Sequence, residues 1–148
     1  MKELHGDLIK LALEGNFDIL IHGANCKGLM GAGIARSIKS AFPCAYEIDI
    51  QTPFNEKAGW FSYAEHILDN GRVLTIVNAY TQVLPGANAD LKLIKSAFNG
   101  ISQNWDKTDR IAYPMIGCGI GGLSWTDVKP IIDKEFEGLD HTVVYYKE

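Results

Sequence analysis

Residues 17–35 read Phe17-Asp-Ile-Leu-Ile-His-Gly-Ala-Asn-Cys-Lys-Gly-Leu-Met-Gly-Ala-Gly-Ile-Ala35, an apolar run followed at once by a glycine-rich stretch. The run from Phe17 to His22 predicts a short buried strand. The glycines that follow let the backbone adopt positive φ and approach a ligand closely. Residues 34–42 then precede Pro43, which predicts a helix with a sharp end. Free N–H groups at the start of such a helix can bind an anion, although a turn that needs glycine only for its shape is the alternative.

A second glycine cluster reads Pro114-Met-Ile-Gly-Cys-Gly-Ile-Gly-Gly-Leu-Ser-Trp125. Its glycines satisfy G-x-G-x-x-G after a strand expected over 110–116, but the Rossmann interpretation fails. That motif belongs to the first βαβ unit and needs an acidic residue about 20 positions later. Here only one helix and one strand follow. Two glycine loops between strands and helices fit a ligand with two adjoining anionic parts.

The remaining segments alternate between strand and helix patterns. Two strands over 60–68 and 72–79 flank Asp69-Asn70-Gly71 and predict a hairpin, and a helix is expected over 90–105. Ser124 with Asp127 resembles a capping box, although Pro130 predicts a later start or a kink; a strand over 141–146 ends the pattern. We expect an α/β fold in one domain, residues 1–148: a three-layer α/β/α sandwich with a mixed, mostly parallel sheet. The glycine clusters follow strands and should meet at the carboxyl ends of the sheet.

Composition narrows the class of protein. The net charge of −4 argues against general nucleic-acid or membrane-surface binding, although loop N–H groups can still hold an anionic ligand. No apolar run is long enough to span a bilayer, and no signal peptide is visible. The three cysteines form no C-x-x-C pair, so we expect neither a zinc site nor disulfides. We expect a cytoplasmic monomer without a cofactor or metal.

Side chains that could react are few. Cys26 and Cys118 lie in the two loops, but no arginine follows either at the spacing of a cysteine phosphatase, so spectator roles are expected. The four histidines are scattered and form no metal-ligand pattern. His22 ends a buried strand beside the first loop, where it is either a hydrogen-bonded core residue or a general acid or base facing the ligand.

Taken together, these segments resemble a macrodomain, the fold that binds ADP-ribose. Gly6-Asp7-Leu8 resembles the early motif whose aspartate recognises the adenine amino group. Residues 22–35 resemble the loop around the distal ribose and phosphates, and 114–125 resemble the diphosphate loop. Thr142-Val-Val-Tyr-Tyr146 resembles the closing strand. The resemblance implies that ADP-ribose or ADP-ribose 1″-phosphate is the ligand and that these residues bind it: Asp7, Leu8, Gly23, Ala24, Asn25, Met30, Gly31, Ala32, Gly33, Ile34, Ala35, Gly117, Cys118, Gly119, Ile120, Gly121, Gly122 and Leu123.

The resemblance also bears on activity. Many macrodomain hydrolases carry N-A-A-N and a later aspartate, whereas this chain has His22 at the first position and Ala35 at the aspartate. A second group uses a lysine and an aspartate where we place Ala79 and Gly121. The pattern resembles instead the yeast-type ADP-ribose 1″-phosphate phosphatases and their phage and bacterial relatives, in which the histidine at the His22 position is implicated in catalysis. Asp90 is the only carboxylate partner that we can suggest. A non-catalytic ADP-ribose-binding module, or a hydrolase that removes ADP-ribose from protein or nucleic acid, is the alternative.

Overall fold

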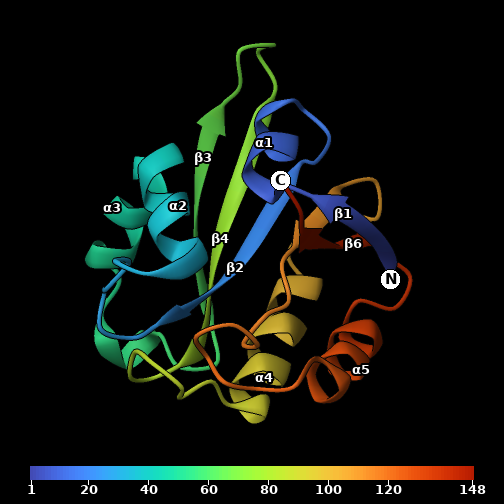
Figure 1. The fold of residues 1–148 in the computed structure, drawn as a ribbon. Helices are drawn as coiled ribbons and strands as arrows, with labels where there is room; N and C mark the ends of the chain where they lie inside the picture. Colours follow the sequence, from blue (N-terminus) through green and yellow to red (C-terminus); the bar gives the residue numbers. More distant parts are fainter.

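The computed structural model describes all 148 residues, which form the expected three-layer α/β/α sandwich (Figure 1). The six strands are ordered β1-β6-β5-β2-β4-β3, and every neighbouring pair is parallel except the antiparallel β3 and β4. None of the helices is long and apolar enough to span a membrane. In chain order the elements are β1 (Lys2–Gly6), α1 (Leu8–Leu13), β2 (Ile19–Asn25), α2 (Gly33–Ala41), α3 (Pro43–Gln51), the 3₁₀ helix η1 (Phe54–Glu56), β3 (Phe61–Ile67), β4 (Val73–Gln82), α4 (Leu91–Ser102), β5 (Arg110–Tyr113), α5 (Trp125–Glu135) and β6 (Asp140–Tyr146).

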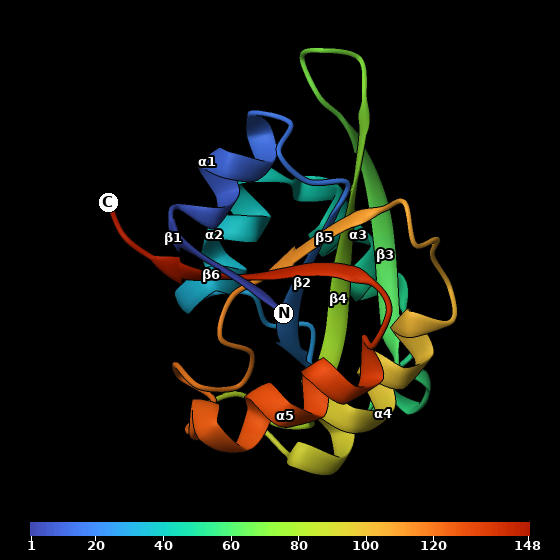
Figure 2. The same cartoon turned by 90° about the vertical axis from the view of Figure 1, so that its right-hand side faces the viewer.

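Helices cover both faces of the sheet, with α1, α2 and α3 on one face and α4 and α5 on the other (Figure 2). The central strand β2 contributes to both cores because successive side chains of a strand point to opposite faces. Leu20 packs in the cluster beneath α1, α2 and α3, whereas Ile19 and Ile21 pack in the cluster beneath α4 and α5. A strand buried on both faces explains the continuous apolar run in the sequence.

The predicted elements are present with shifted ends. Strand β2 begins two residues later than expected and continues to Asn25, and β5 ends at Tyr113, directly before Pro114. Four elements were missed: β1, α1, α3 and the 3₁₀ helix η1. The residues of β1 are largely exposed, so the strand lacks an apolar pattern. The residue expected to end a helix, Pro43, does follow α2 but is also the first residue of α3, a position that proline tolerates because its missing N–H has no partner there.

The start of α5 corrects two expectations. The helix begins directly after Ser124 and continues through Pro130, so the proline does not delay it. The Ser124 hydroxyl does not cap the helix; it lies 2.8 Å from the Thr126 hydroxyl instead. Both Thr126, whose carbonyl would accept from a residue 130 N–H, and Pro130 are exposed, so solvent can compensate for the lost hydrogen bond.

One carboxylate joins the starts of three strands through ion pairs with two arginines. The Asp18 carboxylate, directly before β2, accepts from the Arg110 backbone N–H at 2.8 Å and from its Nε at 3.0 Å. Arg72, at the β3–β4 turn, donates to the same carboxylate at 3.1 Å. Hydrogen bonds from Arg110 lower the pKa of the Asp18 carboxyl.

We expect Asp18→Asn to lower the free energy of unfolding at neutral pH by about 1–3 kcal/mol, because it removes charge-assisted hydrogen bonds. A lowered folded pKa means that the carboxylate stabilises the fold above its ordinary pKa of about 3.9, and that this contribution is lost as the pH falls through the folded value. Denaturant unfolding should therefore show a difference between wild type and Asp18→Asn at neutral pH that shrinks below about pH 4. A difference independent of pH would contradict this role.

Candidate functional site

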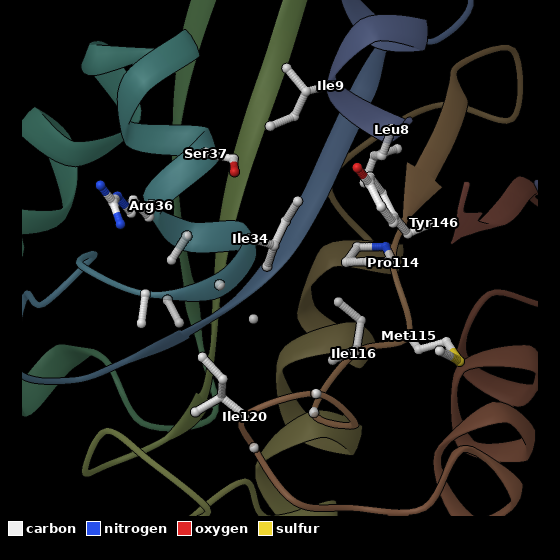
Figure 3. A pocket seen from close by; sticks show the side chains of 18 of the residues that line it. Leu8, Ile9, Ile34, Arg36, Ser37, Pro114, Met115, Ile116, Ile120 and Tyr146 are labelled. Carbon is white, nitrogen blue, oxygen red and sulfur yellow. The ribbon is translucent and has the colours of Figure 1, made fainter. Parts of the chain in front are cut away.

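A cavity of about 1550 Å³ opens at the carboxyl ends of β2, β4 and β5. Figure 3 shows it between the first loop with α2 on one side and the segment after β5 on the other. The two glycine loops therefore meet at one site, as the sequence predicted. Of the predicted binding residues, the following line the cavity: Asp7, Leu8, Gly23, Ala24, Asn25, Gly31, Ala32, Gly33, Ile34, Ala35, Gly117, Cys118, Gly119, Ile120 and Gly121.

The first loop is shaped by the side chain of Asn25, the last residue of β2. Its Oδ1 accepts from the backbone N–H groups of Lys27 and Leu29 at 3.0 and 3.4 Å, and its Nδ2 donates to the Leu29 carbonyl at 2.8 Å. Gly28 has a φ of 71°, in the left-handed region that favours glycine. Asn25 thus folds the loop, in addition to lining the cavity.

Helix α2 begins at the cavity without a cap. Its N-cap residue is Ala32, which has no side chain able to accept from the first turn. The backbone N–H groups from Gly31 to Ala35 donate to no acceptor within the protein. Unpaired N–H groups at the positive end of a helix dipole form a site for an anion such as phosphate.

The second loop offers a matching set of donors. The N–H groups of Gly119, Ile120 and Gly121 donate to no acceptor within the protein. Ile120 reaches across the cavity toward the first loop (Figure 3): its Cδ1 lies 3.0 Å from where a Cβ at Gly33 would be. The two runs of free N–H groups therefore lie on loops that approach each other across one cavity.

The glycines of the second loop serve two different purposes. A Cβ at Gly121 would lie 2.7 Å from the Gly117 carbonyl oxygen and 2.9 Å from the Ala89 Cβ. A Cβ at Gly122 would lie 3.1 Å from the Ala87 Cβ. These positions need glycine because the loop before α4 packs against them. A Cβ at Gly119, by contrast, would meet nothing within 4 Å.

The far end of the cavity is formed by α1 and the end of β6. Asp7 caps α1, since its Oδ1 accepts from the Lys10 N–H at 3.1 Å, and this leaves Oδ2 without a partner in the protein. Leu8 and Tyr146 lie close together at this end, with Pro114 beside them (Figure 3). A planar heterocycle would fit here, because the carboxylate oxygen can accept a hydrogen bond from its polar edge and the apolar side chains can pack against its face.

Four predicted site residues do not line the cavity. Met30 is buried in the core beneath α2, and Leu123 packs against the other core. Gly122 packs against Ala87, as described above. The fourth residue is His22.

His22 is the most consequential correction. It is fully buried, with Nε2 2.6 Å from Asn78 Oδ1, while Nδ1 has no partner. It follows Leu20 on the same face of β2, so the strand pleat directs it toward α3, where its partner Asn78 also donates to the Ala45 carbonyl at 2.9 Å, and it does not line the cavity. Burial also lowers its pKa. The structure therefore places His22 as a core residue and not as a side chain facing the cavity.

Other candidate reactive groups are also accounted for. The suggested partner Asp90 caps α4 by accepting from the Lys92 N–H at 2.8 Å and does not line the cavity. Cys118 lines the cavity, but burial raises its pKa, which disfavours the reactive thiolate. All three cysteines are free, and no cluster of three or more His, Cys, Asp or Glu side chains could hold a metal.

Sequence reasoning missed the wall formed by the loop between β4 and α4. Ala79 is fully buried, whereas Thr81 and Gln82 at the end of the same strand line the cavity. Gln82 Nε2 donates to the carbonyls of Leu84 and Gly86 at 2.7 and 2.9 Å and so holds this loop in place. The residues of β4 that line the cavity are therefore Thr81 and Gln82, and neither can supply the lysine that the second group of hydrolases uses.

Comparison with known proteins agrees with this geometry. The family model described as "Macro domain" matches residues 21–132. An uncharacterised 17.5 kDa protein of the phage T4 tk-vs intergenic region is 31% identical, covering 97% of this chain and 95% of the phage protein.

A Thermosipho africanus protein, described as a DNA ADP-ribosyl transferase–DNA ADP-ribosyl glycohydrolase fusion, is 28% identical, covering 82% of this chain and 36% of the fusion protein. The solved structure of Thermosipho africanus DarTG in complex with ADP-ribose superposes with a TM-score of 0.79 at 22% identity, covering 99% of this chain and 41% of that one. The family model and the phage relative each extend over most of the sequence, and this chain belongs to the macro domain family.

Proposed function

We propose that this macrodomain binds ADP-ribose in the cavity between its two glycine loops. The observation that carries the proposal is the pair of facing N–H runs, Gly31–Ala35 and Gly119–Gly121, none of which has a partner within the protein. Most of these residues are exposed, so water can satisfy their N–H groups in the free protein, and an anion bound between the two loops would replace that water. A diphosphate supplies acceptor oxygens to both runs at once.

The remaining parts of ADP-ribose follow from this position. The adenine would lie at the end of the cavity formed by Asp7, Leu8 and Tyr146, with its amino group donating to the free Asp7 Oδ2. The distal ribose would lie at the opposite end, near Asn25, Thr81 and Gln82. Its 1″ carbon would then be close to the open mouth, where a linked group could leave.

We further propose that the protein hydrolyses the bond at this 1″ carbon. Removal of ADP-ribose from DNA is the first candidate, supported by similarity to the Thermosipho fusion protein. Water would add to C1″, and the linked group would depart with a proton. Hydrolysis of ADP-ribose 1″-phosphate is the second candidate, supported by the N–H donors available to a further phosphoryl group. In that reaction water would attack phosphorus instead of C1″, the bond from phosphorus to the 1″ oxygen would break, and that oxygen would take a proton to give ADP-ribose and phosphate. With no charged side chain from β4 in the cavity, either reaction would depend mainly on positioning and on backbone dipoles.

The role of Asp7 can be separated from its role as a helix cap. Asp7→Ser keeps a hydroxyl that can cap α1 but removes the free carboxylate oxygen. We expect ADP-ribose and AMP to bind about ten- to a hundredfold more weakly by calorimetry, because one charge-assisted hydrogen bond is lost. Asp90→Ser is the matched control, since Asp90 also caps a helix but its side chain does not line the cavity. Equal affinity in Asp7→Ser and wild type would place the adenine elsewhere.

Gly119 tests the position of the diphosphate. Since a Cβ there meets nothing within 4 Å, both Gly119→Gln and Gly119→Glu should fold with the wild-type melting temperature. Both side chains would fill the space of the ligand, and the glutamate would also repel its phosphates. We expect calorimetry to show weaker ADP-ribose binding in Gly119→Gln and a further loss of about tenfold or more in Gly119→Glu. Equal losses in the two variants would argue against a phosphate beside this loop.

Turnover tests the proposed activity and the position of His22. With EDTA present, we expect wild type to release ADP-ribose from an ADP-ribosylated DNA strand, measured by chromatography, with phosphate release from ADP-ribose 1″-phosphate assayed in parallel. His22→Ala leaves the Asn78 oxygen unpaired and should cost about 1–3 kcal/mol of stability, while the turnover of the folded fraction stays within about tenfold. No turnover of either substrate, alongside ADP-ribose binding, would leave a binding module. A hundredfold or larger loss of turnover in a stable His22→Ala variant would show that His22 takes part in catalysis.

A further inference from the structure

A second, smaller pocket of about 460 Å³ lies on the other side of the first glycine loop. The loop divides the two spaces: Asn25 and Leu29 line the large cavity, whereas the residues between them line this one. We call it the loop-side pocket. Its lining residues are Cys26, Lys27, Gly28, Ile50, Thr52, Phe54 and Lys57, from the first loop and from the segment at the end of α3 and η1.

The loop-side pocket presents an aromatic ring with a cation over it. The Phe54 side chain is 53% exposed, and Ile50 next to it is 55% exposed. The Lys27 ammonium lies 5.0 Å from the centroid of the Phe54 ring. An exposed aromatic face next to a lysine is the combination by which proteins bind the bases and backbone of single-stranded nucleic acid.

The local charge also differs from that of the whole chain. The lining contains two lysines and no carboxylate, although the chain carries 18 acidic and 14 basic residues. The second lysine, Lys57, is only 4% exposed and is fixed by an ion pair of 3.0 Å with the buried Asp49. Its ammonium also lies 5.2 Å from the Tyr80 ring. The floor of the pocket is therefore rigid, and its rim carries the positive charge of Lys27.

We infer that the loop-side pocket binds a nucleobase of the single-stranded DNA to which the ADP-ribose is attached. This inference rests on the proposed function, which places the distal ribose across the first loop from the pocket. A strand linked at the 1″ carbon would leave the large cavity beside this loop, and a base neighbouring the modified one can then stack on the Phe54 ring in place of the Lys27 ammonium. Lys27 would face the phosphate backbone of the same strand. The pocket would thus give ADP-ribosylated DNA an advantage over free ADP-ribose.

The test compares two ligands in the full chain. Free ADP-ribose is measured by calorimetry, and a labelled single-stranded DNA oligonucleotide carrying one ADP-ribose is measured by fluorescence anisotropy before turnover. We expect wild type to bind the oligonucleotide more tightly, and Phe54→Ala to weaken that binding about 5- to 100-fold without changing the affinity for free ADP-ribose. Phe54→Trp should retain the advantage. Tyr63→Ala, at a similarly exposed aromatic residue on β3, is the matched control and should change neither affinity.

The outcomes separate this inference from the proposed function. If wild type binds ADP-ribose but has no preference for the oligonucleotide, or if Phe54→Ala retains the preference, the pocket does not bind DNA. An equal loss in Phe54→Ala for an ADP-ribosylated peptide would also overturn the assignment to a nucleobase. If wild type fails to bind ADP-ribose at all, the proposed function itself is overturned.

Discussion

The site depends on one constraint, the close packing of backbone on backbone around the second glycine loop. Gly121 and Gly122 have no room for a side chain because Gly117, Ala87 and Ala89 occupy the space. A hydrogen bond of 3.2 Å from the Ala89 N–H to the Gly121 carbonyl fastens the two loops together. These contacts restrict the conformations that the loop backbone can adopt. The N–H groups of Gly119, Ile120 and Gly121, residues that line the cavity, are left without an acceptor in the protein.

Local sequence patterns account for the parts of the molecule that were predictable. The sheet, the hairpin and the position of both glycine loops follow from local patterns: an apolar run, a turn tripeptide, and glycines between a strand and a helix. Residues 17–35 carry two of these features, the apolar run and the glycines, in a single stretch. Because the carboxyl ends of neighbouring parallel strands lie at one edge, the meeting of the two loops followed once β2 and β5 were adjacent. The pairing of the loops therefore required only one long-range contact, the adjacency of β2 and β5.

What could not be predicted depends on contacts between distant segments. The direction of His22 is set by which face of β2 packs beneath α3, and nothing within residues 17–35 states this. Gln82 acts through carbonyls two and four residues later, in a loop without a regular pattern. Pro43 has the same local signature as a helix end and as a helix start, and here it marks both. In each case the local sequence allows two structures, and tertiary packing decides between them.

The uncapped start of α2 has a consequence for how this protein can change. An alanine at position 32 leaves the helix less stable than a serine or aspartate would, by about 1 kcal/mol at a typical N-cap. A substitution that repaired this weakness would place a side-chain oxygen, and with aspartate a negative charge, where the free N–H groups now point. Selection for a more heat-resistant molecule and selection for its ligand would therefore act in opposite directions at a single residue. A search for stabilising variants should leave position 32 unchanged and look for gains elsewhere in the fold.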